Sequence, residues 1–386
     1  MKYLLCLVGI LDLFQPSKCL AQHQRSLKYQ FGNSYKRFEG TIGELPIVMY
    51  LTWLDSPPEG SYFYRKVGQP ITLEAGNNPG ASSHPETFVL TEGIFGDTAS
   101  TNNTLLMSIL NDSSLSGVWL GKGKTLPVKL KESYPKGSYR FDELYIQDTA
   151  GFSVRKVFWD KIDCSYALPL PKDRLSAEER DFILSKVMAY LDCDSVTRPF
   201  DIAACVHSQS KSFFDSSRVD ILDEVSSMSR KEVAEEKDRL RLWSSGTTMD
   251  VLYNEDDILS LQLDEGGFTG GAHDWRNFDL HTLDVRNRKV LALSDITTAD
   301  SAIMERALAK AFRKQYHHGP DQELSEMLFE DYLPANNNFY ITPGGISFVY
   351  SQYEVASWAE GPIEVFVPFS ALKDKLTPWF KERMGL

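Results

Sequence analysis

The chain has 386 residues, of which 42% are hydrophobic and 24% are charged, and its formal net charge at pH 7 is −12. This composition excludes a disordered chain, because it provides enough apolar side chains to bury a core. The excess of acidic residues also argues against nucleic acid as a partner, since a polyanion would be repelled. At this length we expect two domains rather than one.

The first 21 residues have the pattern of a secretory signal peptide. Lys2 supplies positive charge, residues 3–11 form a short apolar run, Pro16 breaks it, and Ala21 precedes the expected cleavage site. The apolar run is too short to span a membrane, and no later segment approaches ~18 continuous apolar residues. The mature protein is therefore expected in the periplasm or outside the cell, without a membrane span. It would keep 39 basic and 52 acidic residues, a net charge of −13, after losing Lys2, Lys18 and Asp12.

Three cysteines, Cys164, Cys193 and Cys205, follow the predicted signal peptide. Three cysteines allow one disulfide and leave one free thiol, and the sequence does not decide which two pair. Cys205 and His207 resemble half of a metal site, but the sequence contains no second half. No metal and no other cofactor is therefore predicted.

Residues 30–150 are expected to form a β-rich domain. Short strand-like runs recur about every ten residues and are separated by clusters of Gly, Pro, Asn and Ser, which is the spacing of a sheet or barrel of antiparallel strands. The predicted strands are residues 41–51, 60–64, 71–73, 87–91, 105–110, 117–120 and 126–130.

Residues 160–386 are expected to form an α+β domain, in which helices pack on an antiparallel sheet. Ser176 and Glu179 form a capping box at the start of one helix. Two further helices are predicted at 219–243 and 299–316. The charged run 230–241 within the first of these is typical of a solvated helix face, with partner binding as the alternative.

The helix at 299–316 is predicted to have an apolar stripe formed by Ile303, Ala307 and Ala311 with the flanking Leu308 and Phe312. Ser370 is expected to cap a final short helix. The predicted strands of this domain are residues 247–253, 258–263, 278–282, 338–342, 346–355 and 363–369.

Residues 268–277, FTGGAHDWRN, form the motif that most resembles a site. Gly270 and Gly271 permit positive φ angles and a close approach of the backbone. His273 could donate or accept a hydrogen bond across a cleft, and Asp274 could orient it. The alternative is a glycine turn or bulge whose histidine bonds to the local backbone, because no nucleophile lies beside the motif.

Glu354 follows Tyr353 in the predicted strand 346–355 and would lie on the same face as Phe348. It could act as a general base, or it could be a buried paired acid or an edge residue. The sequence contains no GxSxG, HExxH or P-loop motif. No catalytic residue is therefore assigned. The candidate ligand-binding residues are Gly270, Gly271, His273, Asp274, Tyr353 and Glu354.

Several short motifs in the second half occur in an order that resembles a known group of extracytoplasmic proteins. They are residues 270–273 (GGAH), the strand at 277–282, residues 290–295 before a helix, and residues 339–342, 345–348, 351–356, 361 and 365–369. Together they resemble the extracellular domain of the RsiV-type lysozyme-sensing anti-sigma factors and the non-catalytic module of the peptidoglycan deacetylase PdaC. The resemblance covers residues 164–376.

The resemblance implies a domain that binds rather than catalyses, with lysozyme or peptidoglycan as the candidate partner. The chain is expected to lack the transmembrane helix and sigma-binding segment of an anti-sigma factor, and also a deacetylase domain. Two alternatives stay open. One is an envelope hydrolase that uses His273, Asp274 and Glu354, and the other is a structural or assembly role for the β-rich domain.

Overall fold

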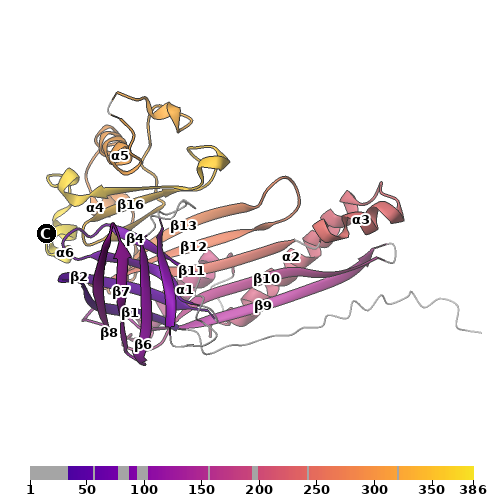
Figure 1. The fold of residues 1–386 in the computed structure, drawn as a ribbon, viewed down its shortest axis with the longest axis horizontal. Helices are drawn as coiled ribbons and strands as arrows, with labels where there is room; N and C mark the ends of the chain where they lie inside the picture. The colour runs from indigo at the N-terminus through magenta and orange to yellow at the C-terminus, as the bar shows by residue number, and fades with distance from the viewer. Residues whose placement is uncertain are drawn as a thin grey trace, which may run out of the picture.

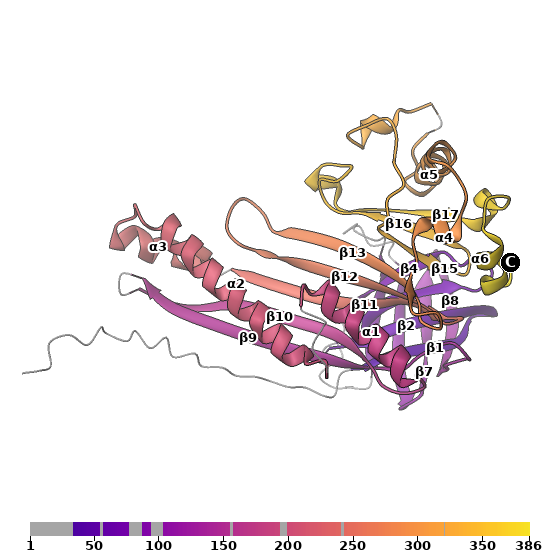
Figure 2. The ribbon, with the colours of Figure 1, turned by 180° about the vertical axis from the view of Figure 1, so that it is seen from behind.

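A computed structural model describes residues 34–54, 57–76, 87–93, 103–154, 157–193, 199–240, 243–319 and 321–386 (Figures 1 and 2). The predicted signal peptide lies outside the described residues. The described residues form a fourteen-stranded, mainly antiparallel sheet, a three-stranded sheet and six α-helices. The α+β class is therefore confirmed in this coarse form.

The N-terminal part is a closed, eight-stranded antiparallel barrel (Figure 1). Each strand pairs with the next, and residues 38–42 of β1 pair with residues 128–132 of β8 to close it. Apolar side chains such as Phe38, Met49 and Leu90 fill its core. The strands are β1 (Ser34–Ile42), β2 (Leu45–Trp53), β3 (Glu59–Tyr64), β4 (Pro70–Ala75), β5 (Thr87–Gly93), β6 (Thr104–Asn111), β7 (Ser114–Gly121) and β8 (Lys124–Glu132).

The predicted strand at 41–51 is wrong in its first residues. Gly43 has a φ of 61° and lies in the turn between β1 and β2, where glycine adopts the left-handed conformation without strain. The sequence pattern does not reveal this turn, because Ile42 and Leu45 flank it and continue the apolar run of the strands. The other six strands predicted for this region are confirmed.

A long arm extends from the barrel (Figures 1 and 2). Its strand β9 continues the barrel sheet through a pairing of Ser34 with Asp142. Strands β9 and β10 pair with each other in antiparallel register, from Val154 with Val157 to Phe141 with Pro171. Strand β10 pairs in parallel with β11, which the intervening helices α1–α3 make possible. The arm strands are β9 (Phe141–Val154), β10 (Val157–Pro171), β11 (Ser244–Glu255), β12 (Ile258–Phe268), β13 (Trp275–Asp284) and β14 (Lys289–Val290).

Helices α1 (Ala177–Tyr190) and α2 (Ile202–Glu224) lie along the arm strands, and α3 (Arg230–Leu240) lies toward its far end (Figure 2). The capping box of Ser176 and Glu179 is confirmed. The helical character predicted at about 219–243 is confirmed, but the bounds are wrong, because that region holds the end of α2 and then α3, and α2 begins much earlier. Asp201 starts α2 by accepting a hydrogen bond from Ala204 N at 2.9 Å, a cap that the sequence reasoning overlooked.

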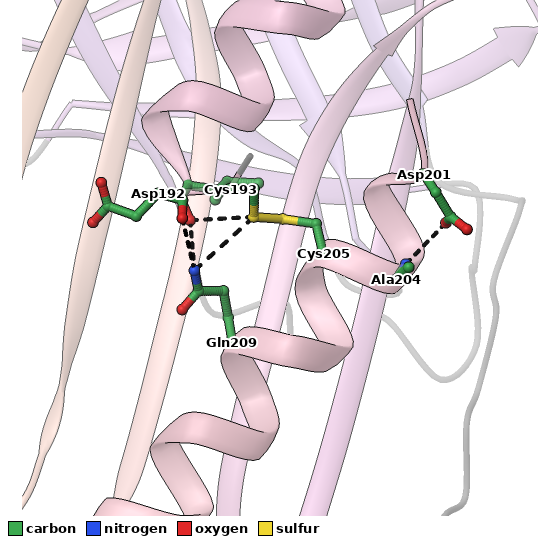
Figure 3. Close-up of a disulfide and its surroundings, with 7 residues drawn as sticks. Asp192, Cys193, Asp201, Ala204, Cys205 and Gln209 are labelled. Atoms are coloured by element: carbon green, nitrogen blue, oxygen red, sulfur yellow. Dashed lines mark hydrogen bonds between the residues drawn. A yellow bond between two sulfur atoms is a disulfide. The ribbon is translucent and has the colours of Figure 1, made fainter. Parts of the chain in front are cut away.

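Cys193 and Cys205 form a disulfide between the end of α1 and the first turn of α2 (Figure 3). Their Cα atoms are 5.9 Å apart, and Gln209 Nε2 adds a hydrogen bond to Leu191 O at 2.9 Å. Cys164 is the free thiol and is buried. The disulfide therefore forms a covalent link between the two helices that lie along the arm.

The C-terminal layer packs a three-stranded sheet against α5 (Ser301–Gln315). The buried side chains of α5 are Met304, Leu308 and Phe312, so the predicted stripe is confirmed at Leu308 and Phe312. Its other members, Ile303, Ala307 and Ala311, are only partly buried and pack at the edge of the core. The other elements are α4 (Leu293–Ile296), η1 (Leu324–Glu326), β15 (Phe339–Thr342), β16 (Gly345–Tyr350), η2 (Trp358–Glu360), β17 (Ile363–Pro368), η3 (Phe369–Leu372) and α6 (Pro378–Met384).

The final helix α6 is capped by Thr377, whose hydroxyl accepts a hydrogen bond from Phe380 N at 3.3 Å. The prediction that Ser370 caps this helix is therefore wrong, and Ser370 lies in η3. Thr377 and Pro378 form the stronger start signal, because proline is well tolerated in the first turn of a helix.

Two close contacts hold the barrel to the rest of the molecule. Arg37 of β1 is fully buried and donates to Glu39 at 2.7 Å and to Glu255 at the end of β11. The turn after β3 touches the β15–β16 turn so closely that a Cβ atom on Gly344 would lie 2.1 Å from Val67 O. The barrel, the arm and the C-terminal layer are thus joined through buried contacts.

Candidate functional site

The loop between β12 and β13 contains the glycine motif. Gly270 has a φ of 92° and Gly271 a φ of 90°, so both adopt the positive φ angles predicted for them. A Cβ atom on Gly270 would lie 3.4 Å from the ring of Trp243. The motif therefore forms a tight turn that exposes the residues after it.

His273 is exposed and makes two polar contacts. Its Nδ1 lies 2.7 Å from Asp274 O, and its Nε2 lies 3.3 Å from the hydroxyl of Tyr353. A carbonyl oxygen can only accept, so in the neutral imidazole Nδ1 donates to Asp274 O and Nε2 accepts from the Tyr353 hydroxyl. The imidazole also stacks on Trp358, with ring centroids 4.6 Å apart and an interplanar angle of 23°.

Tyr353 has a φ of 66°, which is strained for an aromatic residue, and its side chain is 57% exposed. It lies in the turn after β16. We call the side chains of His273, Tyr353 and Trp358 the aromatic cluster. The cluster joins the loop after β12 to the turn after β16. The two residues in contact, His273 and Tyr353, are 80 residues apart in the sequence.

The prediction that Glu354 lies in a strand on the Phe348 face is wrong. Strand β16 ends at Tyr350, and Glu354 is an exposed residue of the following turn. Its carboxylate accepts from Ser351 N at 2.9 Å and from Asn336 Nδ2 at 3.2 Å. The alternation of the preceding strand concealed the turn, because Ser351 can continue a strand pattern as readily as begin a turn.

The described contacts bring together His273 and Tyr353 among the predicted residues, and they place Glu354 elsewhere. Glu354 lines a cavity of about 470 Å³ together with Asp279, His281 and three asparagines, and neither His273 nor Asp274 lines it. Asp274 contacts the imidazole of His273 through its backbone carbonyl oxygen. Within the described residues, His273 thus has no carboxylate hydrogen-bonded to it.

Sequence reasoning missed Trp358. It lies in the short helix η2, where neither strand nor helix periodicity marks it. The available signal was its position two residues after the motif at 351–356. In the described part of the chain, no group of three or more His, Cys, Asp or Glu side chains is placed to hold a metal ion.

A separate group of acids lies between the arm and the barrel. The pKa of Asp250 on β11 is raised to about 7, mainly by burial and also by the negative charges of Asp264 and Glu59, while Arg276 lowers it. Burial also raises the pKa of Glu143. These shifts reflect how the arm and the barrel pack against each other.

Two protein families match separate segments of the chain. Residues 201–275 match the family described as deacetylase PdaC, and residues 294–370 match the family of unknown function DUF3298. The first segment carries His273 and the second carries Tyr353 and Trp358, so the aromatic cluster forms where the two segments meet. The resemblance to RsiV-type anti-sigma factors stays a prediction.

A solved structure of a DUF3298 family member from Bacteroides fragilis shares the fold, with a TM-score of 0.54 and 19% identity over 65% of this chain and 100% of that one. A DUF3298 family protein from Pseudomonas aeruginosa is more distant, with a TM-score of 0.40 and 16% identity over 62% of this chain and 95% of that one. No curated protein matches the chain. Among the described helices, none has the length and hydropathy to cross a membrane.

Proposed function

We propose that the chain is a non-enzymatic binding protein of the bacterial envelope and that cell-wall glycan is its ligand. The observation that carries this proposal is the aromatic cluster. Tyr353 presents an exposed ring from a strained backbone, and such strain is typical of functional positions. Aromatic rings offer an apolar face beside a polar handle, which suits the apolar faces and hydroxyls of sugar rings.

The envelope location is supported by three independent features. The first 21 residues are predicted to be a signal peptide, and the PdaC match is to a family named for a deacetylase. The Cys193–Cys205 disulfide favours an oxidising compartment, because disulfides are rare in the reducing cytosol.

Binding is favoured over hydrolysis by the contacts of His273. Both of its ring nitrogens are engaged, one by a backbone carbonyl and one by the Tyr353 hydroxyl. At a histidine general base, one ring nitrogen faces the hydroxyl or thiol of a nucleophile and a second group, usually a carboxylate, orients the ring. The orienting group of His273 is a backbone carbonyl, and the hydroxyl it faces is the phenol of the exposed Tyr353. Glu354 is hydrogen-bonded within its own turn instead.

A basic protein such as lysozyme is the second candidate ligand. The net charge of −12 favours it, because an acidic surface steers a basic partner toward itself. Such an attraction weakens as salt is added, whereas stacking on the aromatic cluster depends little on salt. Salt dependence therefore separates the two ligands.

The test is co-sedimentation of the purified protein with insoluble peptidoglycan. We expect binding that Tyr353→Ala and Trp358→Ala each weaken at least about tenfold, a loss of ~1.4 kcal/mol. Trp379→Ala is the matched control, because Trp379 is also partly exposed but lies on α6. It should bind as the parent does.

Lack of sedimentation by the parent protein would contradict the glycan proposal. Retention on immobilised lysozyme that disappears near 0.5 M salt and ignores Trp358→Ala would instead support the second candidate. Hydrolysis of peptidoglycan that His273→Ala abolishes would overturn both.

A further inference from the structure

A second cavity lies between the barrel and the C-terminal layer. It has a volume of about 730 Å³, and its walls come from the ends of β3, β4 and β5, from α5, and from β17 with η3. We call it the rim cavity. Small-molecule sites typically measure ~300–1,000 Å³, and the mouths of barrels are among their usual locations. The lining residues of the barrel belong to neither matched family segment.

The rim cavity exists because small side chains face it. Ala307 and Ala311 of α5 lie on one side, and Gly93, Ser370 and Ala371 lie on others. Ala307 and Ala311 belong to the predicted apolar stripe of α5. The large members of that stripe, Leu308 and Phe312, are buried, whereas the two alanines are partly buried and line the cavity. Apolar side chains of a helix that stay exposed to water raise the free energy of the folded protein, unless another group covers them.

The remaining wall is mostly apolar. Ile71 and Pro70 contribute from β4, and Phe366 and Pro368 contribute from β17. This wall would receive the apolar body of a ligand, because removing such surface from water is favourable by roughly 25 cal/mol per Å².

The cavity runs along the free edge of β17, but that edge is already satisfied. Gln315 Nε2 donates to Glu364 O at 2.7 Å, and Phe366 N donates to Gln315 Oε1 at 3.2 Å. An added peptide strand would need those same backbone groups. The ligand is therefore not a strand of another protein.

The two buried acids of the cavity are held by protein donors. Glu364 is 6% exposed and accepts from the Tyr340 hydroxyl at 2.5 Å. Glu92 is 4% exposed and accepts from Tyr62 and Trp119, both at 2.5 Å, and from Asn103 at 2.7 Å. Burial raises the pKa of Glu364, whereas its hydrogen bonds with Tyr340 and Ser347 lower it.

The basic groups of the cavity are Lys310 and Lys314, one turn apart on α5. Both are exposed, and neither has a carboxylate within ion-pair distance among the described residues. Two ammonium groups at the border of an apolar wall are suited to a negatively charged head group.

We propose that the rim cavity binds a single-chain anionic amphiphile. Its carboxylate or phosphate head lies between Lys310 and Lys314, and its apolar chain lies along Ile71 and Phe366. This inference is independent of the glycan proposal, because it uses a different surface and a different ligand.

The test is isothermal titration of the protein with dodecanoate, dodecyl phosphate and dodecyltrimethylammonium, each below the concentration at which it forms micelles. We expect one site for each anionic amphiphile and at least about tenfold weaker binding of the cationic one. Equal binding of all three, or none, would overturn the proposal.

Variants then place the site. Ala311→Trp is designed to fill the cavity. Ala371→Trp is designed to fill it from an exposed residue that is not part of the hydrophobic core. Each should abolish binding of dodecanoate, and the second decides the question if the first fails to fold. Lys310→Gln with Lys314→Gln should weaken binding at least about tenfold. Lys211→Gln with Lys231→Gln, the same charge change on α2 and α3, should leave it unchanged.

Undiminished binding by the cavity-filling variants, or by the Lys310/Lys314 variant, would overturn the assignment. A further arm uses vesicles of anionic phospholipid. Binding to vesicles without binding to free dodecanoate would show a membrane-surface interaction and would also overturn it.

Discussion

Tyr353 and Glu354 are neighbours in sequence with different roles. Tyr353 takes a positive φ and extends its ring outward, whereas Glu354 turns back and caps Ser351 N. The sequence placed both in a strand, because the alternation of β16 continues past its end. The motif at 270–273 was easier to interpret, because paired glycines before an exposed histidine indicate a turn directly.

Asp250 supports a prediction about pH at this scale. Its pKa in the folded protein is about 7, raised by burial and by Asp264 and Glu59, compared with an ordinary value near 3.8. The folded state thus binds a proton more tightly than the unfolded state. The stability that this group contributes is complete below about pH 4 and is lost as the pH rises through 7.

Asp250→Asn should therefore raise the free energy of unfolding at pH 8 by about 1–2 kcal/mol, because one pKa unit corresponds to ~1.4 kcal/mol and the side chain is only partly buried. The gain should shrink at pH 5. Urea unfolding at both pH values measures it, with Asp274→Asn in the exposed loop as control. A gain that is the same at both pH values would contradict the account of Asp250.

At the scale of elements, the helices α1 and α2 depend on the Cys193–Cys205 disulfide. The sequence left three possible pairings open, because spacing along the chain does not show which thiols approach each other. Asp201 was the missed signal. Once it starts α2, Cys205 falls in the first turn of that helix, facing the end of α1.

Replacing both cysteines by serine should lower the free energy of unfolding by about 3 kcal/mol. The reason is that a disulfide between cysteines 12 positions apart in the sequence restricts the unfolded chain. Chemical denaturation with and without a reducing agent measures the loss. Cys164→Ala, which removes the buried thiol without burying a hydroxyl, serves as the control for loss of a thiol without loss of a bridge and should cost less. A reducing agent that leaves the midpoint of the parent unchanged would contradict this role.

At the scale of the molecule, the barrel and the arm share one sheet and, besides the barrel's own core, one core cluster. The sheet passes from β1 to β9, and the same core cluster includes Tyr50 and Phe63 of the barrel and Leu261 of the arm. Local sequence patterns predicted the individual strands well, because the alternation of polar and apolar residues in a strand involves only neighbouring residues. They did not give this continuity, because the pairing of Ser34 with Asp142 and of Arg37 with Glu255 depends on contacts distant in sequence.

Glu255→Gln should destabilise the whole molecule by about 3 kcal/mol, because it leaves Arg37 buried beside a weaker partner. Glu235→Gln, from an exposed pair with Lys231, should cost less than ~1 kcal/mol. Unfolding followed by circular dichroism and by tryptophan fluorescence should shift together in Glu255→Gln. If one probe moves and the other does not, the barrel and the arm do not unfold as a unit.

The central claim is that the aromatic cluster binds cell-wall glycan, and the most direct measurement is a tryptophan fluorescence titration with soluble peptidoglycan fragments. The account predicts a saturable change in emission that is lost in Trp358→Phe and weakened at least about tenfold in Tyr353→Ala, while Trp379→Phe keeps it. A saturable change that persists in Trp358→Phe and Tyr353→Ala, or no change in the parent protein, would contradict the claim.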